Sequence, residues 1–301
     1  MSKRNLKQQM IYSIDQAFVP GVKKGNLTPG EQEQKERIHS FQYRNNLRDT
    51  ACDFASYAKE NFGIRMAKDL TKDHAEAYLA AKIKGCSPTT VEQYRSRLAT
   101  VGRILSSNYG YDIDLSVKPL MRASSDNKVR DIAMKREDFK KVMEHGNDCV
   151  SKMGLRLSEA FGLRVSEIVK IEPRDIKDTC LHIHQSKGGR DRDIEIRTDH
   201  QRAVLRDLLA FNQVAYNERI IEVKADSINK YLHNTLKRLQ INEYDDHNTG
   251  VHSIRKMYAT ERYDELREAG KSHAEAWGDV SEELGHSRDR EDLFSVYVVH
   301  R

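Results

Sequence analysis

GLRVSEI, at residues 162–168, has the form of a turn between two helices. Gly162 is suited to the left-handed backbone that ends many helices, and an apolar run follows the polar residues of the turn. An almost identical heptapeptide, GLRLSEA, stands at residues 154–160. This spacing is too short for a solenoid repeat, so the two copies simply provide two candidate arginines, Arg156 and Arg164.

Around this turn, residues 134–301 are predicted to form a mainly α-helical domain with one small antiparallel sheet. CLHIH (180–184) and DIEI (193–196) alternate apolar and polar residues, and SKGGR (186–190) supplies a glycine-containing turn between them. This pattern is typical of a β-hairpin. Helical periodicity predicts further helices at residues 200–216, 226–239, 253–268, 272–284 and 290–298.

The N-terminal part has a different organisation. Residues 3–18 are predicted to form a short amphipathic helix, and the glycines and prolines of 19–30 predict a hinge. A helical bundle over 31–112 follows, and 113–133 has the composition of a linker. The predicted helices of the bundle cover residues 32–61, 71–84 and 88–109. The expected domains are therefore 1–30, 31–112, 113–133 and 134–301.

Composition excludes several classes of protein. The 301 residues include 51 Lys and Arg against 46 Asp and Glu, a net charge of +5 that permits a nucleic-acid partner without requiring one. No segment approaches the roughly 20 apolar residues that cross a bilayer, and the N-terminus lacks the apolar core of a secretory signal. The four cysteines are widely spaced, so we expect no disulfide framework, no zinc site and a cytoplasmic location.

Four separated segments carry side chains suited to metal-free transfer of a phosphodiester bond: GLRVSEI, SKGGR, HSIR (252–255) and LGHS (284–287), the last followed by Tyr297. Two arginines can clamp phosphate oxygens and stabilise a pentavalent transition state. A lysine can protonate a leaving oxygen, histidines can shuttle protons, and a tyrosine near cations is a serviceable nucleophile. His252 and Arg255 share one face at a helix start, where the peptide dipoles favour an anion.

In this order and spacing, the segments resemble the signature of the tyrosine recombinases, the lambda-integrase-like or phage integrase family. The resemblance covers most of 134–301, and TTVEQYRSRL (89–98) resembles the core-binding domain of that family. It implies a helical core-binding domain joined to a catalytic domain of the DNA breaking-rejoining fold. It also implies an enzyme that cuts and rejoins DNA through a 3′-phosphotyrosine bond, with no metal and no cofactor.

The resemblance assigns the phosphate-binding roles. Arg164 and Arg255 would hold the scissile phosphate, His286 would hydrogen-bond one of its oxygens, and Glu167 would support the site. Arg164 is preferred over Arg156 because the family's arginine turn leads into a short helix and an apolar-x-x-Asp-Ile stretch, which only Arg164 has downstream.

The remaining roles follow in the same way. Tyr297 would be the nucleophile, His252 would assist transfer of its proton, and Lys187 would protonate the leaving 5′ oxygen. Arg190 and Arg192 are interpreted as solvated turn residues or phosphate contacts. Candidate contacts to the DNA backbone are Lys82, Lys84, Thr89, Tyr94, Arg95, Arg97 and Arg190.

The resemblance implies that the partner is double-stranded DNA, which the two domains would enclose as a clamp. It also implies that four copies of the chain act on two synapsed DNA sites and exchange strands through a Holliday junction. An accessory factor that sets direction would be a further partner. We expect a phage-encoded or bacterial, nucleoid-associated enzyme that integrates or excises a mobile element. The alternatives are a chromosome-dimer resolvase, a type IB topoisomerase and a non-catalytic DNA-binding regulator; the intact set of candidate residues argues against the last.

Two features stay open from the sequence. The segment 3–18 is expected either to dock on a neighbouring subunit or to bind an accessory DNA arm. His182 and His184 lie on one face of the first predicted strand and could in principle bind a metal. Because no carboxylate or cysteine stands at a matching spacing, we interpret these two histidines as strand-surface residues.

Overall fold

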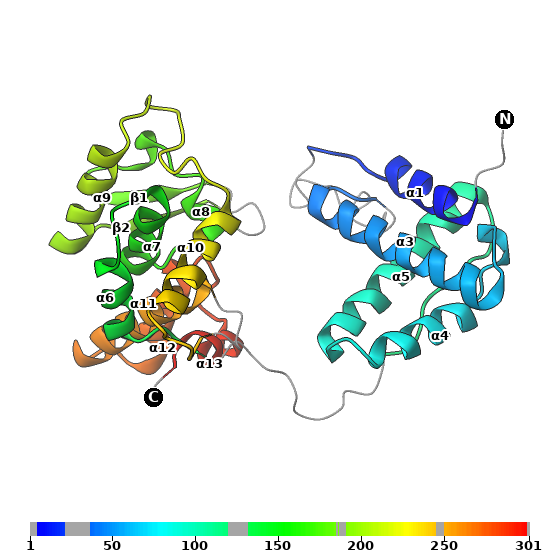
Figure 1. Ribbon diagram of the computed structural model, residues 1–301. Coiled ribbons are helices and arrows are strands. Elements are labelled where there is room, and N and C mark those ends of the chain that lie inside the picture. Colours follow the sequence, from blue (N-terminus) through cyan, green and yellow to red (C-terminus); the bar gives the residue numbers. More distant parts are fainter. Residues whose placement is uncertain are drawn as a thin grey trace. The chain divides into compact units, whose positions relative to one another are not determined.

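The computed structural model describes residues 5–21, 37–119, 132–184, 186, 191–244 and 250–299. The chain divides into two compact units, residues 1–127 and 128–301, whose boundary falls within the segment that the sequence marks as a linker. Both units are built mainly of α-helices, and the described residues contain one two-stranded antiparallel sheet (Figure 1). The predicted fold class is therefore confirmed.

The first unit is a helical bundle. Its helices are α1 (Leu6–Gln16), α3 (Phe41–Phe62), α4 (Lys72–Ile83) and α5 (Pro88–Tyr109), with a 3-10 turn at η2 (Ala67–Asp69). The long helix predicted from residue 32 begins only at Phe41, so that prediction was wrong for residues 37–40. The reason is local, because the extended Ser40 accepts a hydrogen bond from the amide of Tyr43 and caps the helix there.

Helix α1 is part of this bundle. It lies alongside α3 (Figure 1), and Leu6, Met10 and Ile14 are buried. Asn5 and Gln8 form a capping box at its start, and Gln9 accepts a 2.7 Å hydrogen bond from the amide of Ala67. The predicted amphipathic helix is therefore confirmed, but its apolar face is covered within its own chain. Docking that face on a neighbouring subunit would first require α1 to leave the bundle.

The second unit carries the remaining elements. Its helices are α6 (Arg136–Glu144), α7 (Val150–Phe161), α8 (Val165–Ile168), α9 (Asp199–Phe211), α10 (Ala225–Arg238), α11 (Val251–Glu268), α12 (His273–Glu283) and α13 (Phe294–Tyr297), with 3-10 turns at η3 (Pro173–Asp175) and η5 (Glu291–Leu293). Strands β1 (Cys180–Ile183) and β2 (Arg192–Glu195) pair with Leu181 opposite Ile194. The predicted hairpin is confirmed. The helix predicted at 200–216 ends earlier, at Phe211, because Asn212 is extended.

Helix α7 forms the centre of this unit. It packs against α9, α10 and α11, and most of its side chains are buried. A Cβ atom at Gly154 would lie 2.9 Å from the Cδ1 atom of Ile228, so the missing side chain lets α10 approach closely. The two similar heptapeptides thus have different structures, because 154–160 lies inside α7 whereas 162–168 ends that helix and begins α8.

A separate apolar cluster holds the C-terminal helices together. Trp277 on α12 contacts Phe294 on α13 with ring centroids 5.5 Å apart, and Phe294 also meets Tyr263 on α11 at 5.1 Å. The indole Nε1 of Trp277 donates a 3.1 Å hydrogen bond to the carbonyl of Arg290, the residue before η5. In Figure 1, α12 and α13 (orange to red) accordingly lie together. This cluster anchors the short helix that ends at Tyr297.

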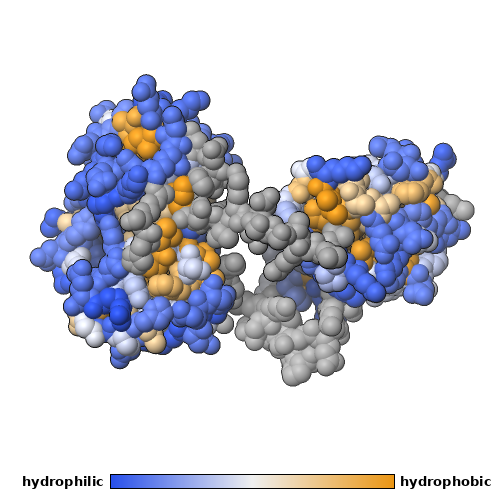
Figure 2. Space-filling view, turned by 90° about the horizontal axis from the view of Figure 1, so that it is seen from below, coloured by the Kyte–Doolittle hydropathy of each residue, from blue (hydrophilic) through white to orange (hydrophobic). Residues whose placement is uncertain are grey.

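The described surface agrees with the polar composition of the chain. Figure 2 shows a mostly hydrophilic face with smaller apolar patches on each unit. Among the described helices, none combines the length and the apolar character that a bilayer-spanning segment needs.

Truncating a buried side chain of α1 tests whether this helix stabilises the bundle. Met10→Ala is expected to lower the free energy of unfolding by about 2–5 kcal/mol, because a fully buried side chain leaves a cavity. Urea denaturation measures this change, with exposed Lys7→Ala on the same helix as the control, expected within about 0.5 kcal/mol of the parent. Equal stability of the two variants would contradict the packing of α1.

Candidate active site

Two left-handed glycine turns bring the ends of α7 and α12 to the site. Gly162 (φ +62°) follows α7, and Gly285 (φ +73°) follows the last residues of α12. A Cβ atom at Gly285 would lie 2.9 Å from Nη1 of Arg192 and 3.3 Å from Nη1 of Arg164. Glycine is therefore needed at 285 both for the backbone conformation and for the approach of two guanidinium groups.

Arg255 joins these two helix ends. Its side chain is fully buried, and its Nη1 and Nη2 atoms donate to the carbonyls of Gly162 and Leu284. A cation is favoured there because the carbonyls at helix C-termini carry partial negative charge. Burial lowers the pKa of Arg255 to about 10, and the nearby charge of Arg164 adds to this effect. The group still carries its charge at neutral pH.

Glu167 is the anion at the centre of the site. It is 2% exposed and accepts hydrogen bonds from Nη1 of Arg164 at 2.9 Å and from Oγ of Ser186 at 2.6 Å. Its Oε2 atom accepts from the backbone amide of Arg164 and lies 3.9 Å from Nη1 of Arg255. The same carboxylate therefore orients Arg164 through both main chain and side chain, as a cap on the first turn of α8.

Arg192, which comes from β2, completes this network. Its Nη1 and Nη2 atoms donate to the two oxygens of Glu167, both at 3.0 Å, and its Nε atom donates to the carbonyl of Glu283. The side chain is only 11% exposed, so its interpretation as a solvated turn residue was wrong. The alternation of side chains along the strand could have predicted that Arg192 is buried, because Arg192 lies on the same face as the buried Ile194. Ser186, which donates a hydrogen bond to Glu167, was also absent from the site residues predicted from the sequence.

The surrounding charges determine whether the carboxyl group of Glu167 is ionised. Burial by itself raises the pKa of this carboxyl group, but the hydrogen bonds and charge of Arg192 and the charge of Arg255 outweigh burial. The net effect holds the pKa of Glu167 well below its usual range, so the group is ionised at neutral pH.

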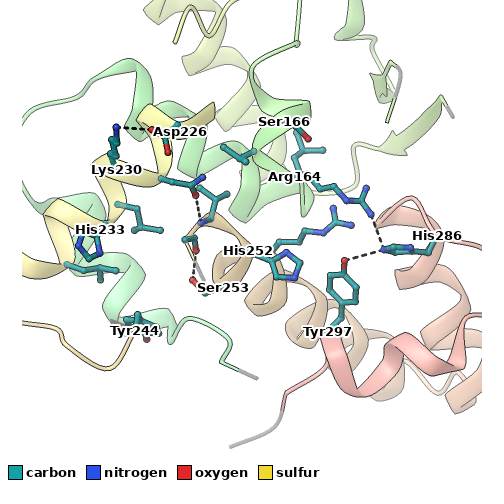
Figure 3. Close-up of a pocket in the computed structure, with 18 residues that line it drawn as sticks. Arg164, Ser166, Asp226, Lys230, His233, Tyr244, His252, Ser253, His286 and Tyr297 are labelled. Carbon is teal, nitrogen blue, oxygen red and sulfur yellow. Dashed lines mark hydrogen bonds and ion pairs between the residues drawn. The ribbon is translucent and has the colours of Figure 1, made fainter. Parts of the chain in front are cut away.

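Tyr297 points into this arrangement from the end of α13 (Figure 3). Its hydroxyl lies 3.2 Å from Nε2 of His286, and the same nitrogen lies 2.9 Å from Nη2 of Arg164. Because a guanidinium can only donate, Nε2 of His286 accepts from Arg164, which assigns the ring proton to Nδ1. The guanidinium carbon of Arg255 is 5.4 Å from the Tyr297 ring centre, and the His252 ring is also 5.4 Å away.

Five of these residues line one cavity of about 850 Å³, namely Arg164, His252, Arg255, His286 and Tyr297. Arg164, His252, His286 and Tyr297 occupy one part of it, and residues of α10 such as Lys230 line another (Figure 3). The site holds three guanidinium groups around one carboxylate, which leaves a local excess of positive charge. Such a cavity is suited to an anion such as a phosphate group.

The structure brings together five of the six predicted catalytic residues, namely Arg164, His252, Arg255, His286 and Tyr297, with Glu167 beside them. Lys187 and Arg190 lie outside the described residues. The rejected candidate, Arg156, forms a 2.6 Å ion pair with Asp207.

The predicted DNA contacts of the first unit are placed as follows. Lys82 forms a 2.6 Å ion pair with Asp53, and Arg95 donates to Glu92 and to the carbonyl of Val117. Both cations are thus engaged within the chain. Among the other candidates, Lys84 and Thr89 are exposed, and Tyr94 and Arg97 are half-buried.

The sequence of the chain matches the phage integrase family over residues 133–289, which is more than half of its length. The chain belongs to this family. The phage integrase family is the family of tyrosine recombinases, enzymes that cleave and rejoin DNA strands. No curated protein sequence matches this chain.

Solved recombinase structures share the fold. A lambda integrase dimer bound to a COC′ core site matches with a TM-score of 0.68 and 14% identity, covering 97% of this chain and 77% of that one. XerH recombinase bound to palindromic difH substrate in a post-cleavage complex matches with a TM-score of 0.65 and 14% identity, covering 98% of this chain and 91% of that one. A lambda integrase tetramer bound to a Holliday junction matches with a TM-score of 0.63 and 17% identity, covering 88% of this chain and 75% of that one.

The buried carboxylate of Glu167 is expected to make the stability of the protein depend on pH. Glu167→Gln leaves the arginines without their counter-charge, so it is expected to lower the free energy of unfolding at neutral pH by about 3–5 kcal/mol. Because the folded protein depresses the pKa of Glu167, its contribution is complete above the ordinary value of 4.5 and is lost as pH falls below it. The stability difference between parent and variant should therefore shrink in acid.

Denaturation measured at a series of pH values from neutral to acid follows this difference. Glu261→Gln removes a more exposed carboxylate from an ion pair with Arg136 and is the control. A difference between parent and Glu167→Gln that stays constant down to acid pH would contradict the depressed pKa of Glu167.

Proposed function

We propose that this chain is a site-specific DNA recombinase that cleaves one strand at a time through a covalent 3′-phosphotyrosine bond to Tyr297. The observation that carries the proposal is the position of Tyr297, whose hydroxyl lies 3.2 Å from Nε2 of His286 and whose ring centre lies 5.4 Å from the guanidinium carbon of the buried Arg255. A phosphate placed against Arg164 and His286 would lie next to this hydroxyl. A nucleophile held next to the reacting phosphorus needs little further reorganisation.

The reaction would proceed by transesterification. The phenolic oxygen of Tyr297 attacks phosphorus, the bond from phosphorus to the 5′ oxygen breaks, and the phenolic proton leaves with the help of His252. Lys187 donates a proton to the departing 5′ oxygen. Arg164 and Arg255 bind the non-bridging oxygens, on which charge accumulates in the transition state. His286 joins them when the phosphate takes the place of Arg164 at its Nε2 atom, because that nitrogen can then carry the ring proton and donate a hydrogen bond. Attack by a 5′ hydroxyl of another strand reverses these steps and releases Tyr297.

The arginines keep the donors that this role requires. Each Nη atom carries two hydrogens, so Arg255 can bind the carbonyls of Gly162 and Leu284 and still offer hydrogens to a phosphate. The Nε atom of Arg255 is buried without a hydrogen-bond partner among the described residues. Arg164 is 15% exposed and is the more accessible of the two.

The assembly and the biological role rest on similarity. We propose that four copies act on two DNA sites and exchange strands through a Holliday junction, as the lambda integrase tetramer bound to such a junction suggests by its likeness. We further propose that the reaction integrates or excises a mobile element, because the family match is to phage integrases. An accessory factor that sets direction belongs to the same proposal.

Removing the nucleophilic oxygen tests the central step. Tyr297→Phe is expected to abolish the covalent protein–DNA adduct on a nicked suicide substrate, while DNA binding stays within a few-fold of the parent, because only the hydroxyl is lost. Denaturing gels detect the adduct. Tyr216→Phe, at a residue 68% exposed, is the matched control and should retain full adduct formation. An adduct at the parental level in Tyr297→Phe would refute the assignment.

A second test isolates the proposed general acid. Lys187→Ala is expected to slow cleavage by about 10²–10⁴-fold, because a 5′ alkoxide is a poor leaving group without a proton. A substrate with sulfur at the bridging 5′ position should restore the rate, since a thiolate leaves unprotonated.

Single-turnover cleavage measures both rates. His252→Ala is the comparison, because a group that acts on the tyrosine proton should not be rescued by the sulfur substrate. Equal rescue of the two variants, or none for Lys187→Ala, would contradict the role given to Lys187.

A further inference from the structure

The hairpin of β1 and β2 presents a second set of polar side chains on the face opposite Arg192. His182 pairs with Asp193 across the strands, and Ile183 pairs with Arg192. Extending the same antiparallel register places His184 beside Asp191. Because side chains alternate between the faces of a strand, two histidines and two aspartates gather on one face, outside the arginine network.

Three of these side chains converge. One ligand-type atom from each of His182, His184 and Asp191 lies within 4.8 Å of the other two, and the two imidazole centres are 4.5 Å apart. The carboxylate that the sequence did not offer at a matching spacing thus comes from the other strand. All three side chains are at least partly accessible to solvent.

Each histidine also contacts a carboxylate that is not one of the three converging groups. Nδ1 of His182 lies 2.5 Å from Oδ1 of Asp193, and Nε2 of His184 contacts Oδ1 of Asp175. Asp175 is itself buried and accepts the amide of Glu172 at 3.0 Å, so its position is well determined. A carboxylate that binds one ring nitrogen orients the ring and leaves the other nitrogen for a metal, which is the usual arrangement around metal-bound histidines.

We propose that His182, His184 and Asp191 form a binding site for a divalent transition metal of the Zn²⁺ type. Two imidazole nitrogens and one carboxylate oxygen suit this class of ion, and water would complete its coordination. The ligands lie on both sides of residues 185–190, the segment that contains Lys187. A bound ion would therefore link the end of β1 to the start of β2.

The competing explanation is that these residues form only histidine–aspartate ion pairs, His182 with Asp193 across the hairpin and His184 with Asp175 of η3. Both explanations place the side chains together, but only a metal site binds an ion with defined stoichiometry. The proposal does not depend on the proposed recombinase function, because binding is measured without DNA.

Titration of the full-length, reduced protein with Zn²⁺ by calorimetry, together with native mass spectrometry, tests the site. The parent is expected to bind one equivalent that the double variant His182→Ala/His184→Ala does not bind. Asp191→Asn, a change at an exposed residue, should weaken binding at least about 10-fold without disturbing the fold. His200→Ala removes an exposed imidazole elsewhere and should bind as the parent does.

Hydrogen exchange of the segment 180–195 provides a readout of structure. Zn²⁺ is expected to slow exchange there in the parent and in His200→Ala, and to leave the double variant unchanged. A parent that binds no Zn²⁺, or a double variant that binds the same equivalent with the same affinity, would overturn the proposal. Since the four cysteines are present in every variant, any binding to thiols cancels in the comparison.

Discussion

The candidate site depends on one buried carboxylate. Glu167 contacts the guanidinium groups of Arg164 and Arg192 directly and lies within ion-pair distance of Arg255. Three cations so close together would repel one another, and burial would add a desolvation cost to each. The carboxylate offsets both effects, yet it neutralises only part of the charge. The remaining positive charge is what makes the cavity suited to a phosphate group.

The scaffold that holds these charges is made of helix ends. Arg255 binds the carbonyls at the ends of α7 and α12, so a single side chain links two helices that are distant in sequence. Tyr297 is the last residue of the four-residue helix α13, and the contacts of Phe294 on this helix with Trp277 and Tyr263 hold it in place. Apolar packing therefore positions the tyrosine, and the ion network positions the groups around it.

The small hairpin serves two purposes because its strands have two different faces. Arg192 points to the inner face and binds Glu167, whereas His182 and His184 lie on the other face with Asp191. The inner face thus completes the proposed active site, and the outer face offers ligands to a metal ion. Both sets of contacts involve residues that flank the segment 185–190, which contains Lys187, so the two proposals concern the same short stretch of chain.

Most of the helices, the hairpin, the order of the motifs and thereby the family could be predicted from the sequence, although the start of α3 and the end of α9 could not. Periodicity and capping act over one or two turns, so they can be read from neighbouring residues: Gly162 ends α7, and Ser87 and Pro88 begin α5. The choice of Arg164 over Arg156, two residues in nearly identical heptapeptides, came from the resemblance to the family, because only Arg164 is followed by the residues that the family has downstream. The structure was needed to show that Arg192 pairs with Glu167, that α1 is covered by its own bundle, and that Asp191 joins the two histidines. The first two depend on which elements meet across long stretches of chain, and the third depends on the register of the hairpin, which alternation of apolar and polar residues does not set.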